Sequence, residues 1–194
     1  MRCVRLNFTS QPAIIPRYMQ QQDEQFMQLA LEQALRSKAG GDVPFGACIV
    51  KDGEVIAVAE NSELRCHDVT KHAEVNAIAK ASELLGRDLS GCTIYSTVEP
   101  CTMCTGAILY ANIGRIVVGA TREDMPHIFR VRNIRFQHLA ADYGHTPEVV
   151  HGVLTRDCVA AFDHHKRSWR VNTALIVSDD TSSVPVASAL SSAS

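Results

Sequence analysis

The chain has 194 residues, of which 46% are hydrophobic and 21% charged, and its formal net charge is -2. This composition is typical of a globular protein and provides enough apolar residues for one domain with a substantial core. A charge so close to zero argues against a protein that binds nucleic acid through a strongly basic surface. A small, lightly charged ligand is the better expectation.

The seven cysteines lie at positions 3, 48, 66, 92, 101, 104 and 158. Their odd number and scattered positions fit a reducing compartment rather than a disulfide framework. The sequence contains no run of 18 apolar residues, which predicts that no membrane span is present. We therefore expect a cytoplasmic protein. An organellar transit peptide is the alternative, because three arginines precede the first acidic residue, Asp23.

Hydrophobic periodicity and turn residues predict the following elements in chain order: an irregular N-terminal arm over 1–21, a helix from about Asp23 to just before Gly40, strands over 45–50 and 55–60, a polar loop over 61–70, a helix over 71–85, a strand over 92–98, a helix over 101–111, a strand over 115–120, a polar and partly helical segment over 121–146, a strand over 148–154, and a helix over 155–165. Asp52-Gly53, between the first two strands, is a strong hairpin signal. Residues 171–194 are rich in Ser and Ala, lack periodicity, and are predicted to be a disordered tail.

Strands alternate with helices after the opening hairpin. This order predicts an α/β protein, specifically a three-layer α/β/α domain with a mixed sheet of about five strands. We expect this domain to span residues 22–170.

Two short motifs lie 26 residues apart, His72-Ala73-Glu74 and Pro100-Cys101-Thr102-Met103-Cys104. His72, Cys101 and Cys104 supply three protein ligands for a tetrahedral Zn²⁺, one ion per chain. A structural zinc site has four protein ligands, whereas a catalytic site keeps one position for water. Cys66 or Cys92 could in principle be a fourth ligand, but Glu74 would then have no role. The count of three points to a catalytic zinc.

Both motifs open predicted helices, where free N–H groups and partial positive charge favour thiolates. Cys101 and Cys104 are three residues apart and face the same side of their helix. Glu74 is predicted to lie near the metal without binding it and to act as the catalytic proton shuttle. Attack of activated water on an amidine-like ring carbon, followed by loss of ammonia, is hydrolytic deamination. The pair H-x-E and P-C-x-x-C is the signature of zinc nucleobase deaminases.

The chain resembles the cytidine-deaminase-like superfamily over about residues 23–165. The resemblance is carried by Pro44-Phe45-Gly46-Ala47, His72-Ala73-Glu74-Val75 and Glu99-Pro100-Cys101-Thr102-Met103-Cys104-Thr105-Gly106-Ala107-Ile108. These segments look like the branch that holds bacterial guanine deaminases, tRNA adenosine deaminases and fungal-type cytosine deaminases, with guanine deaminase the nearest. The resemblance implies the cytidine-deaminase-like fold, a role in purine metabolism and a homodimer, because relatives build their pockets near or across a subunit interface.

The resemblance also implies substrate contacts. Asn61 would hydrogen-bond the ring, which suits an amide because it both donates and accepts; its alternative role is a turn residue. Phe45 would pack against a purine or serve only in the core. Asp124 would handle the substrate amino group or merely cap a turn. The backbone N–H of Ala73, together with Cys101, would contact the ring carbonyl or the developing oxyanion.

We expect a zinc-dependent hydrolytic deaminase of a purine base or nucleoside, with guanine to xanthine as the first hypothesis. Adenosine in tRNA and cytosine are alternatives within the branch, and a non-catalytic zinc-folded subunit of a deaminase complex is an alternative of another class. The guanine hypothesis is weakened because residues 125–130 do not match the segment usual in guanine deaminases and only Trp169 remains as a late aromatic residue. The tRNA alternative is weakened by the missing glycine-rich segment. The following residues form either a basic patch or ordinary solvated helix faces: Arg130, Arg132, Arg135, Lys166, Arg167 and Arg170. We favour the second interpretation and expect no nucleic-acid partner.

Overall fold

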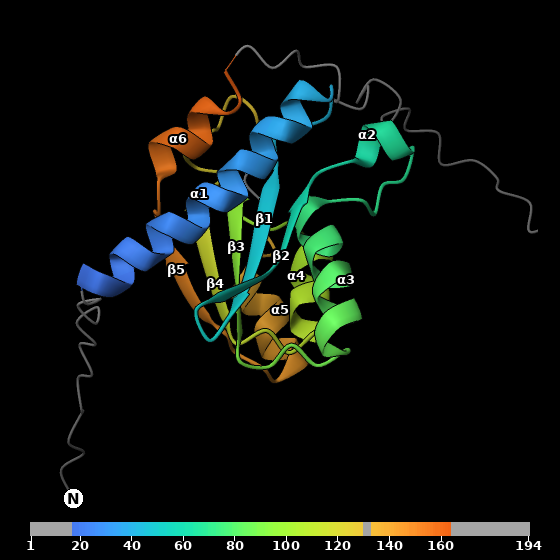
Figure 1. Ribbon diagram of the computed structural model, residues 1–194, viewed down its shortest axis with the longest axis vertical. Coiled ribbons are helices and arrows are strands. Elements are labelled where there is room, and N and C mark those ends of the chain that lie inside the picture. Colours follow the sequence, from blue (N-terminus) through green and yellow to red (C-terminus); the bar gives the residue numbers. More distant parts are fainter. Residues whose placement is uncertain (1–16, 130–132, 164–194) are drawn as a thin grey trace, which may run out of the picture.

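The computed structural model describes residues 17–129 and 133–163. Its strands are β1 (Gly46–Lys51), β2 (Glu54–Glu60), β3 (Cys92–Val98), β4 (Arg115–Ala120) and β5 (Glu148–His151). Its helices are α1 (Arg17–Ala39), α2 (Glu63–Cys66), α3 (Ala73–Leu85), α4 (Thr102–Tyr110), α5 (Phe136–Tyr143) and α6 (Thr155–Ala160). The strands form one sheet with helices on both faces (Figure 1). The predicted three-layer α/β/α fold with a mixed sheet of about five strands is confirmed.

The strand order is β2-β1-β3-β4-β5. β1 is antiparallel to β2 and β3, whereas β3, β4 and β5 run parallel. The predicted hairpin is present, and its turn residues Asp52 and Gly53 have φ of 52° and 82°, as a type I′ turn requires. Because β3 ends at Val98 and α4 begins at Thr102, the two cysteines predicted to bind zinc follow the carboxyl end of a strand, the usual edge for sites in α/β sheets.

Each face of the sheet has its own apolar core. On one face α1 and α6 pack over the sheet, and on the other α3, α4 and the start of α5 do so. Alternating residues of β1 show the division, because Cys48 and Val50 belong to the first core while Ala47 and Ile49 belong to the second. This two-sided burial explains why β1 and β4 contain short apolar runs rather than alternating patterns, and why consecutive residues of β3 are buried although three of them are Thr or Ser.

Gly46 lets α1 approach the sheet closely. A Cβ atom built on Gly46 would lie 1.9 Å from the carbonyl oxygen of Ala30 and 2.6 Å from the backbone nitrogen of Ala34. Both obstacles are backbone atoms of α1, so the helix itself would have to move.

We expect Gly46→Ala to lower the free energy of unfolding by about 3 kcal/mol or more, because this substitution overpacks the α1–β1 contact. Chemical denaturation measures the effect. Gly114→Ala is the control, since a Cβ there meets no atom within 4 Å. Equal stability of the two variants would contradict this account of the close approach.

The structure corrects several predicted boundaries. α1 begins at Arg17 rather than near Asp23. The prediction missed its first residues because they are mostly exposed and polar and show no apolar periodicity. Asp23 is instead buried within α1, where its carboxylate accepts two hydrogen bonds from Arg115 at 2.8 Å and one from the Tyr95 hydroxyl at 3.0 Å. The predicted loop over 61–70 contains the one-turn helix α2, and β5 ends at His151, three residues early.

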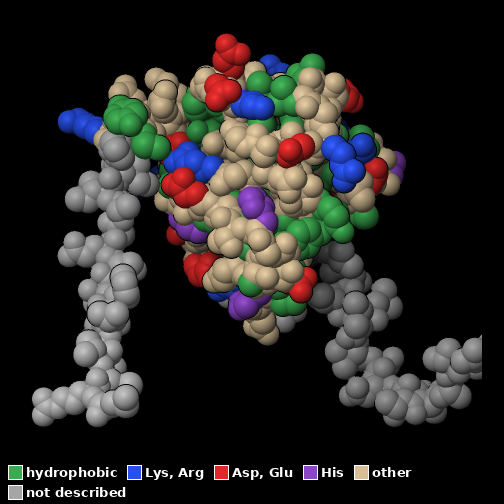
Figure 2. Space-filling model, turned by 90° about the horizontal axis from the view of Figure 1, so that it is seen from below, with side chains coloured by type: hydrophobic (Ala, Val, Ile, Leu, Met, Phe, Trp, Pro, Cys, Tyr) green, Lys and Arg blue, Asp and Glu red, His purple; other side chains and the backbone are tan. Residues whose placement is uncertain are grey.

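Other predictions lie outside the described residues. They concern most of the N-terminal arm, the tail over 171–194, Trp169, and the basic residues Arg130, Arg132, Lys166, Arg167 and Arg170. Within residues 17–129 and 133–163, no helix is both long and apolar enough to cross a membrane. On the face drawn in Figure 2, the coloured acidic and basic side chains are intermixed and form no continuous basic area.

Candidate active site

His72, Cys101 and Cys104 converge as predicted. His72 is the N-cap residue of α3, Cys101 is the N-cap residue of α4, and Cys104 lies in the first turn of α4. The Nδ1 atom of His72 is 3.6 Å from the Cys101 sulfur and 3.4 Å from the Cys104 sulfur, and the two sulfurs are 3.5 Å apart. A tetrahedral zinc with ordinary Zn–S and Zn–N bonds has ligand separations of about 3.6–3.8 Å. The three atoms therefore already form one face of a zinc tetrahedron.

The group of potential metal ligands contains these three residues and no fourth one within the described part of the chain. Cys66 is exposed and Cys92 is buried in β3, and neither joins the group. The three-ligand arrangement expected of a catalytic zinc thus fits the residues present, and His72, Cys101 and Cys104 are positioned to hold the ion.

The two thiols have opposite titration behaviour. Their mutual hydrogen bond lowers the pKa of Cys101 to about 3 and raises the pKa of Cys104, which burial raises further. The hydrogen bond with the Cys101 sulfur raises the pKa of His72. Of the two thiols, Cys101 therefore loses its proton more readily and Cys104 holds its proton more tightly.

Glu74 lies beside the ligand triangle without belonging to it. Its side chain is only 6% exposed, and its Oε2 atom is 3.4 Å from the Cys104 sulfur. Burial, and then the charge of Cys101, raise the pKa of Glu74. Ser96 of β3 places its hydroxyl oxygen 3.2 Å from Oε1 of Glu74 and 2.7 Å from the carbonyl of Val98. Because the hydroxyl has one proton and the Val98 carbonyl is the nearer acceptor, the Ser96 oxygen can accept a hydrogen bond from Glu74 when that carboxyl group is protonated.

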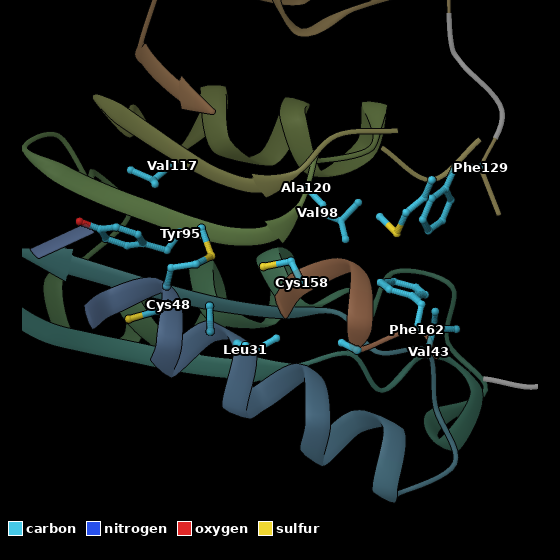
Figure 3. Packing of buried hydrophobic residues seen from close by; sticks show 14 of the residues in the cluster. Leu31, Val43, Cys48, Tyr95, Val98, Val117, Ala120, Phe129, Cys158 and Phe162 are labelled. Atoms are coloured by element: carbon cyan, nitrogen blue, oxygen red, sulfur yellow. The ribbon is translucent and has the colours of Figure 1, made fainter. Parts of the chain in front are cut away.

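A cavity of about 160 Å³ opens at the ligand triangle. Its walls are formed by Val43, Phe45, Glu63, His72, Glu74, Glu99, Cys101, Arg122 and Phe129. Phe45 stands in the wall, where it was expected. Its ring packs against Phe129 and Phe162 at centroid distances of 5.9 and 5.4 Å. Figure 3 shows Phe129, Phe162 and Val43 at the same end of the core cluster.

The sequence did not point to four of these wall residues as functional: Val43, Glu63, Arg122 and Phe129. Glu63 illustrates why. It lies in the short helix α2, which has no apolar periodicity, yet its Oε2 atom is 3.6 Å from Nε2 of His72. Since Nδ1 faces the cysteines, Glu63 lies beside the outer nitrogen of the predicted zinc ligand, a position from which carboxylates commonly orient such histidines.

Two predicted substrate contacts, Asn61 and Asp124, are not among the residues that line the cavity, although the Asn61 N–H contacts the carbonyl of the wall residue Phe45. Asn61 is fully buried, and its Nδ2 atom donates a hydrogen bond of 2.6 Å to Asp42. Asp124 accepts hydrogen bonds of 2.7 Å from the backbone and hydroxyl of Thr121, so it caps a turn. Ala73 is buried as the first residue of α3, next to His72.

A second, larger cavity of about 590 Å³ lies beyond Glu99 and Pro100, between the sheet and α5. Its apolar wall includes Ile116, Val118 and Phe136. None of the three predicted zinc ligands lines it. The small cavity at the ligand triangle is therefore the candidate active site.

Comparison with known proteins agrees with this geometry. The family model for the cytidine and deoxycytidylate deaminase zinc-binding region matches residues 20–120. The chain is 47% identical over 96 residues to the tRNA-specific adenosine deaminase of Agrobacterium fabrum and 40% identical over 98 residues to the cytosine deaminase of Candida albicans. These matches cover 49% and 50% of this chain and 63% and 65% of the relatives, so the chain spans less than two thirds of either relative.

Solved structures share the fold. One, from a study of A-to-I editing by tRNA:A34 deaminases, has a TM-score of 0.63 at 36% identity and covers 71% of this chain and 98% of that chain. The guanine deaminase of Bacillus subtilis has a TM-score of 0.51 at 35% identity and covers 62% of this chain and 91% of that chain. The family model includes both motifs of the ligand triangle and extends over more than half of the sequence. The chain therefore belongs to the cytidine and deoxycytidylate deaminase zinc-binding family.

Proposed function

We propose that this protein is a zinc-dependent hydrolytic deaminase of a purine base or nucleoside, with guanine to xanthine as the first reaction to test. The observation that carries the proposal is Glu74, a buried carboxylate that lines the cavity and stands outside the ligand triangle. A zinc site that served only the fold would need no acid in this position.

His72, Cys101 and Cys104 would hold the metal. When bound, zinc lowers the pKa of a coordinated water to about 7 and so supplies a nucleophile at neutral pH. Glu74 takes one proton as the water oxygen attacks the ring carbon that bears the amine, and it delivers this proton to the adjacent ring nitrogen. It then takes the second proton from the hydroxyl now on that carbon and delivers it to the leaving amine. The C–N bond breaks, and ammonia leaves as the carbonyl forms.

The cavity suits a flat heterocycle. Phe45 and Phe129 line it, and they are held in place by Phe162, whose ring meets both edge-on at 5.4 and 5.5 Å. The Arg122 guanidinium lies 5.3 Å from the Phe129 ring centroid, which further fixes that wall. We assign the aromatic wall to stacking against the base and the fully buried amide of Asn61 to one of its polar edges. Asp124 is left with its turn-capping role.

Adenosine in tRNA is the second candidate, because it is the substrate named for the Agrobacterium relative and for the tRNA:A34 deaminase structure. The charges around the cavity favour a small base instead. Among the described residues of its wall, three acids, Glu63, Glu74 and Glu99, outnumber one arginine, Arg122. The nearby cation Arg65 pairs with Glu60 and Asp42, and Arg135 pairs with Glu123 and Glu99. A site for a polyanion would instead expose unpaired basic side chains.

An assay of ammonia release tests the proposal. The panel contains guanine, guanosine, adenine, cytosine and a tRNA anticodon stem-loop. Release from guanine or guanosine supports the first reaction, and release only from the stem-loop supports the second candidate. Zinc-loaded protein that releases ammonia from none of them would overturn the enzymatic proposal and favour a non-catalytic subunit.

We further propose a homodimer that uses the outer side of α4. This helix packs inward through Cys104, Thr105, Ile108 and Leu109, yet its other side is also apolar. Met103 is 38% and Tyr110 is 72% exposed there, and Tyr110 packs edge-on against Tyr143 of α5 at 5.0 Å.

We propose the cytoplasm as the location of the protein, because free thiols at all six described cysteines suit a reducing compartment.

Tyr110→Glu is expected to convert the dimer to a monomer, because a carboxylate would be desolvated in an apolar interface. Analytical ultracentrifugation measures the mass. Val69→Glu is the control, since Val69 is equally exposed at 72% but lies outside α4 and α5. Loss of the dimer in both variants, or in neither, would contradict the proposed interface.

A further inference from the structure

We propose that Asp42 is a positioning residue that sets the hydrogen-bonding polarity of the substrate site. Its carboxylate holds the Asn61 amide so that the oxygen Oδ1 is the free end. The substrate must then present an N–H donor to this oxygen. This inference rests on the proposed function and deepens it, because it concerns which edge of a base the site accepts.

Asp42 lies in the loop between α1 and β1, and its side chain contacts the residues that follow β2. Its side chain is fully buried, and both carboxylate oxygens accept hydrogen bonds. Oδ1 accepts from the backbone N–H of Val43 at 2.9 Å and from Asn61 Nδ2 at 2.6 Å. Oδ2 accepts from the backbone N–H groups of Leu64 and Arg65, both at 3.0 Å. Every one of these partners is a donor, so Asp42 acts as an acceptor on both sides.

This arrangement leaves Asn61 with one orientation. Only its NH₂ group can face the carboxylate, because two oxygens 2.6 Å apart would repel each other. The Oδ1 atom therefore points the other way. It is buried and has no hydrogen-bond partner among the described residues. An unpaired buried carbonyl costs free energy unless an ordered water or a ligand supplies the missing donor, and we assign this place to the substrate.

The backbone of Asn61 is fixed as well. Its N–H donates to the carbonyl of Phe45 at 3.0 Å, and its own carbonyl accepts from the Ser37 hydroxyl at 2.9 Å and from Arg65 at 3.2 Å. Phe45, whose carbonyl accepts the bond from Asn61, and Glu63, two residues after Asn61 along the chain, both line the cavity. The side-chain oxygen is the one N or O atom of the Asn61 side chain without a hydrogen-bond partner among the described residues.

Asp42 also caps the start of α2 through Leu64 and Arg65, so a purely structural role is the competing explanation. An exchange of the two side chains separates the explanations. In Asp42→Asn, the oxygen must remain toward the two N–H groups of Leu64 and Arg65. The new NH₂ group then faces Asn61, and the hydrogen bond from the Val43 N–H is lost. The Asn61 amide then has to turn, and it presents a donor where the acceptor stood.

For Asp42→Asn we expect kcat/KM for guanine to fall by about 10²-fold, mainly through KM. In the double variant that also carries Asn61→Asp, one carboxylate oxygen accepts from the new NH₂ group at position 42. The other oxygen restores the acceptor that faces the ligand. This double variant should recover at least about tenfold in kcat/KM relative to Asp42→Asn. Asn61→Asp alone places two carboxylates together and should be impaired. A structural cap would give a double variant no better than Asp42→Asn, and that result would overturn the proposal.

The chain offers a matched control at its surface. Asp88 accepts a hydrogen bond of 3.2 Å from Nδ2 of Asn112, and both residues are remote from the cavity wall. Asp88→Asn should leave kcat and KM unchanged. Zinc content should stay at the wild-type level in all variants, because none of these residues belongs to the ligand triangle.

Binding to the wild-type protein provides a test that needs no variant to fold. Calorimetry compares guanine with hypoxanthine, 1-methylguanine and 9-methylguanine, which remove the 2-amino, N1–H and N9–H donors respectively. We expect at least one analogue to bind about 10²-fold more weakly than guanine. Equal affinity for all four would overturn the acceptor role of Asn61 even if deamination occurs. Binding of guanine without ammonia release would overturn the proposed reaction. The relative affinities of the analogues would still test the acceptor role of Asn61.

Discussion

Replacing Glu74 with Gln is expected to reduce kcat by about 10²–10⁴-fold while zinc content remains at the wild-type level. Gln keeps the size of the side chain and the contact with Ser96, but it cannot take a proton from water or deliver one to the base. Glu74 stands outside the ligand triangle, so the change leaves all three metal ligands in place. Steady-state kinetics and metal analysis of the same preparation provide the measurement.

Glu83→Gln is the matched control, because Glu83 belongs to the same helix, α3, but is exposed at its far end. It should show wild-type kinetics. Turnover by Glu74→Gln within tenfold of the wild type would exclude the proton-shuttle role. A loss of zinc together with activity would instead assign Glu74 to the integrity of the metal site.

The parts of the site that the sequence could predict are those encoded by neighbouring residues. Cys101 and Cys104 share one helical turn, and His72 and Glu74 are two residues apart, so the local geometry of each motif follows once each helix start is known. The strands β3 and β4 were predicted with their correct bounds, Cys92–Val98 and Arg115–Ala120, because their β-branched residues are flanked by residues that interrupt a strand, such as Pro100 and Gly114.

What the sequence could not supply are contacts between distant segments. Asp42 binds Asn61 and the first turn of α2, and nothing near Asp42 marks it as different from a loop acid. Glu63 lies beside Nε2 of His72 because the hydrogen bonds from Leu64 and Arg65 to Asp42 hold α2 next to the ligand triangle. Asp23 resembles a helix-start acid, yet it is buried against Arg115, 92 residues away along the chain. In each case the role of the acidic side chain depends on contacts with distant segments, and the residues next to it in the sequence do not reveal these contacts.

Replacing Cys104 with Ala is expected to lower the bound zinc to a small fraction of one ion per chain and to abolish turnover. The change removes one of three protein ligands and leaves only His72 and Cys101. In the wild type, the apparent zinc affinity should rise by at least about tenfold per pH unit through the neutral range. The pKa of Cys104 is raised by its hydrogen bond with Cys101 and by burial, so the metal displaces a proton from this thiol. The pKa of His72 is also raised, by its hydrogen bond with the Cys101 sulfur, so its proton adds to the slope where the imidazole is charged. Competition with a chromophoric chelator at several pH values measures both effects.

Cys66→Ala separates a catalytic from a structural zinc site. Cys66 is the exposed cysteine that the sequence left open as a fourth ligand, and the structure places it outside the ligand group. This variant should keep its zinc, its activity and the slope of affinity with pH. If Cys66→Ala lost zinc as Cys104→Ala does, four side chains would hold the metal and no position would remain for water. The opening for a nucleophile, and with it hydrolytic deamination, depends on Cys66 being dispensable.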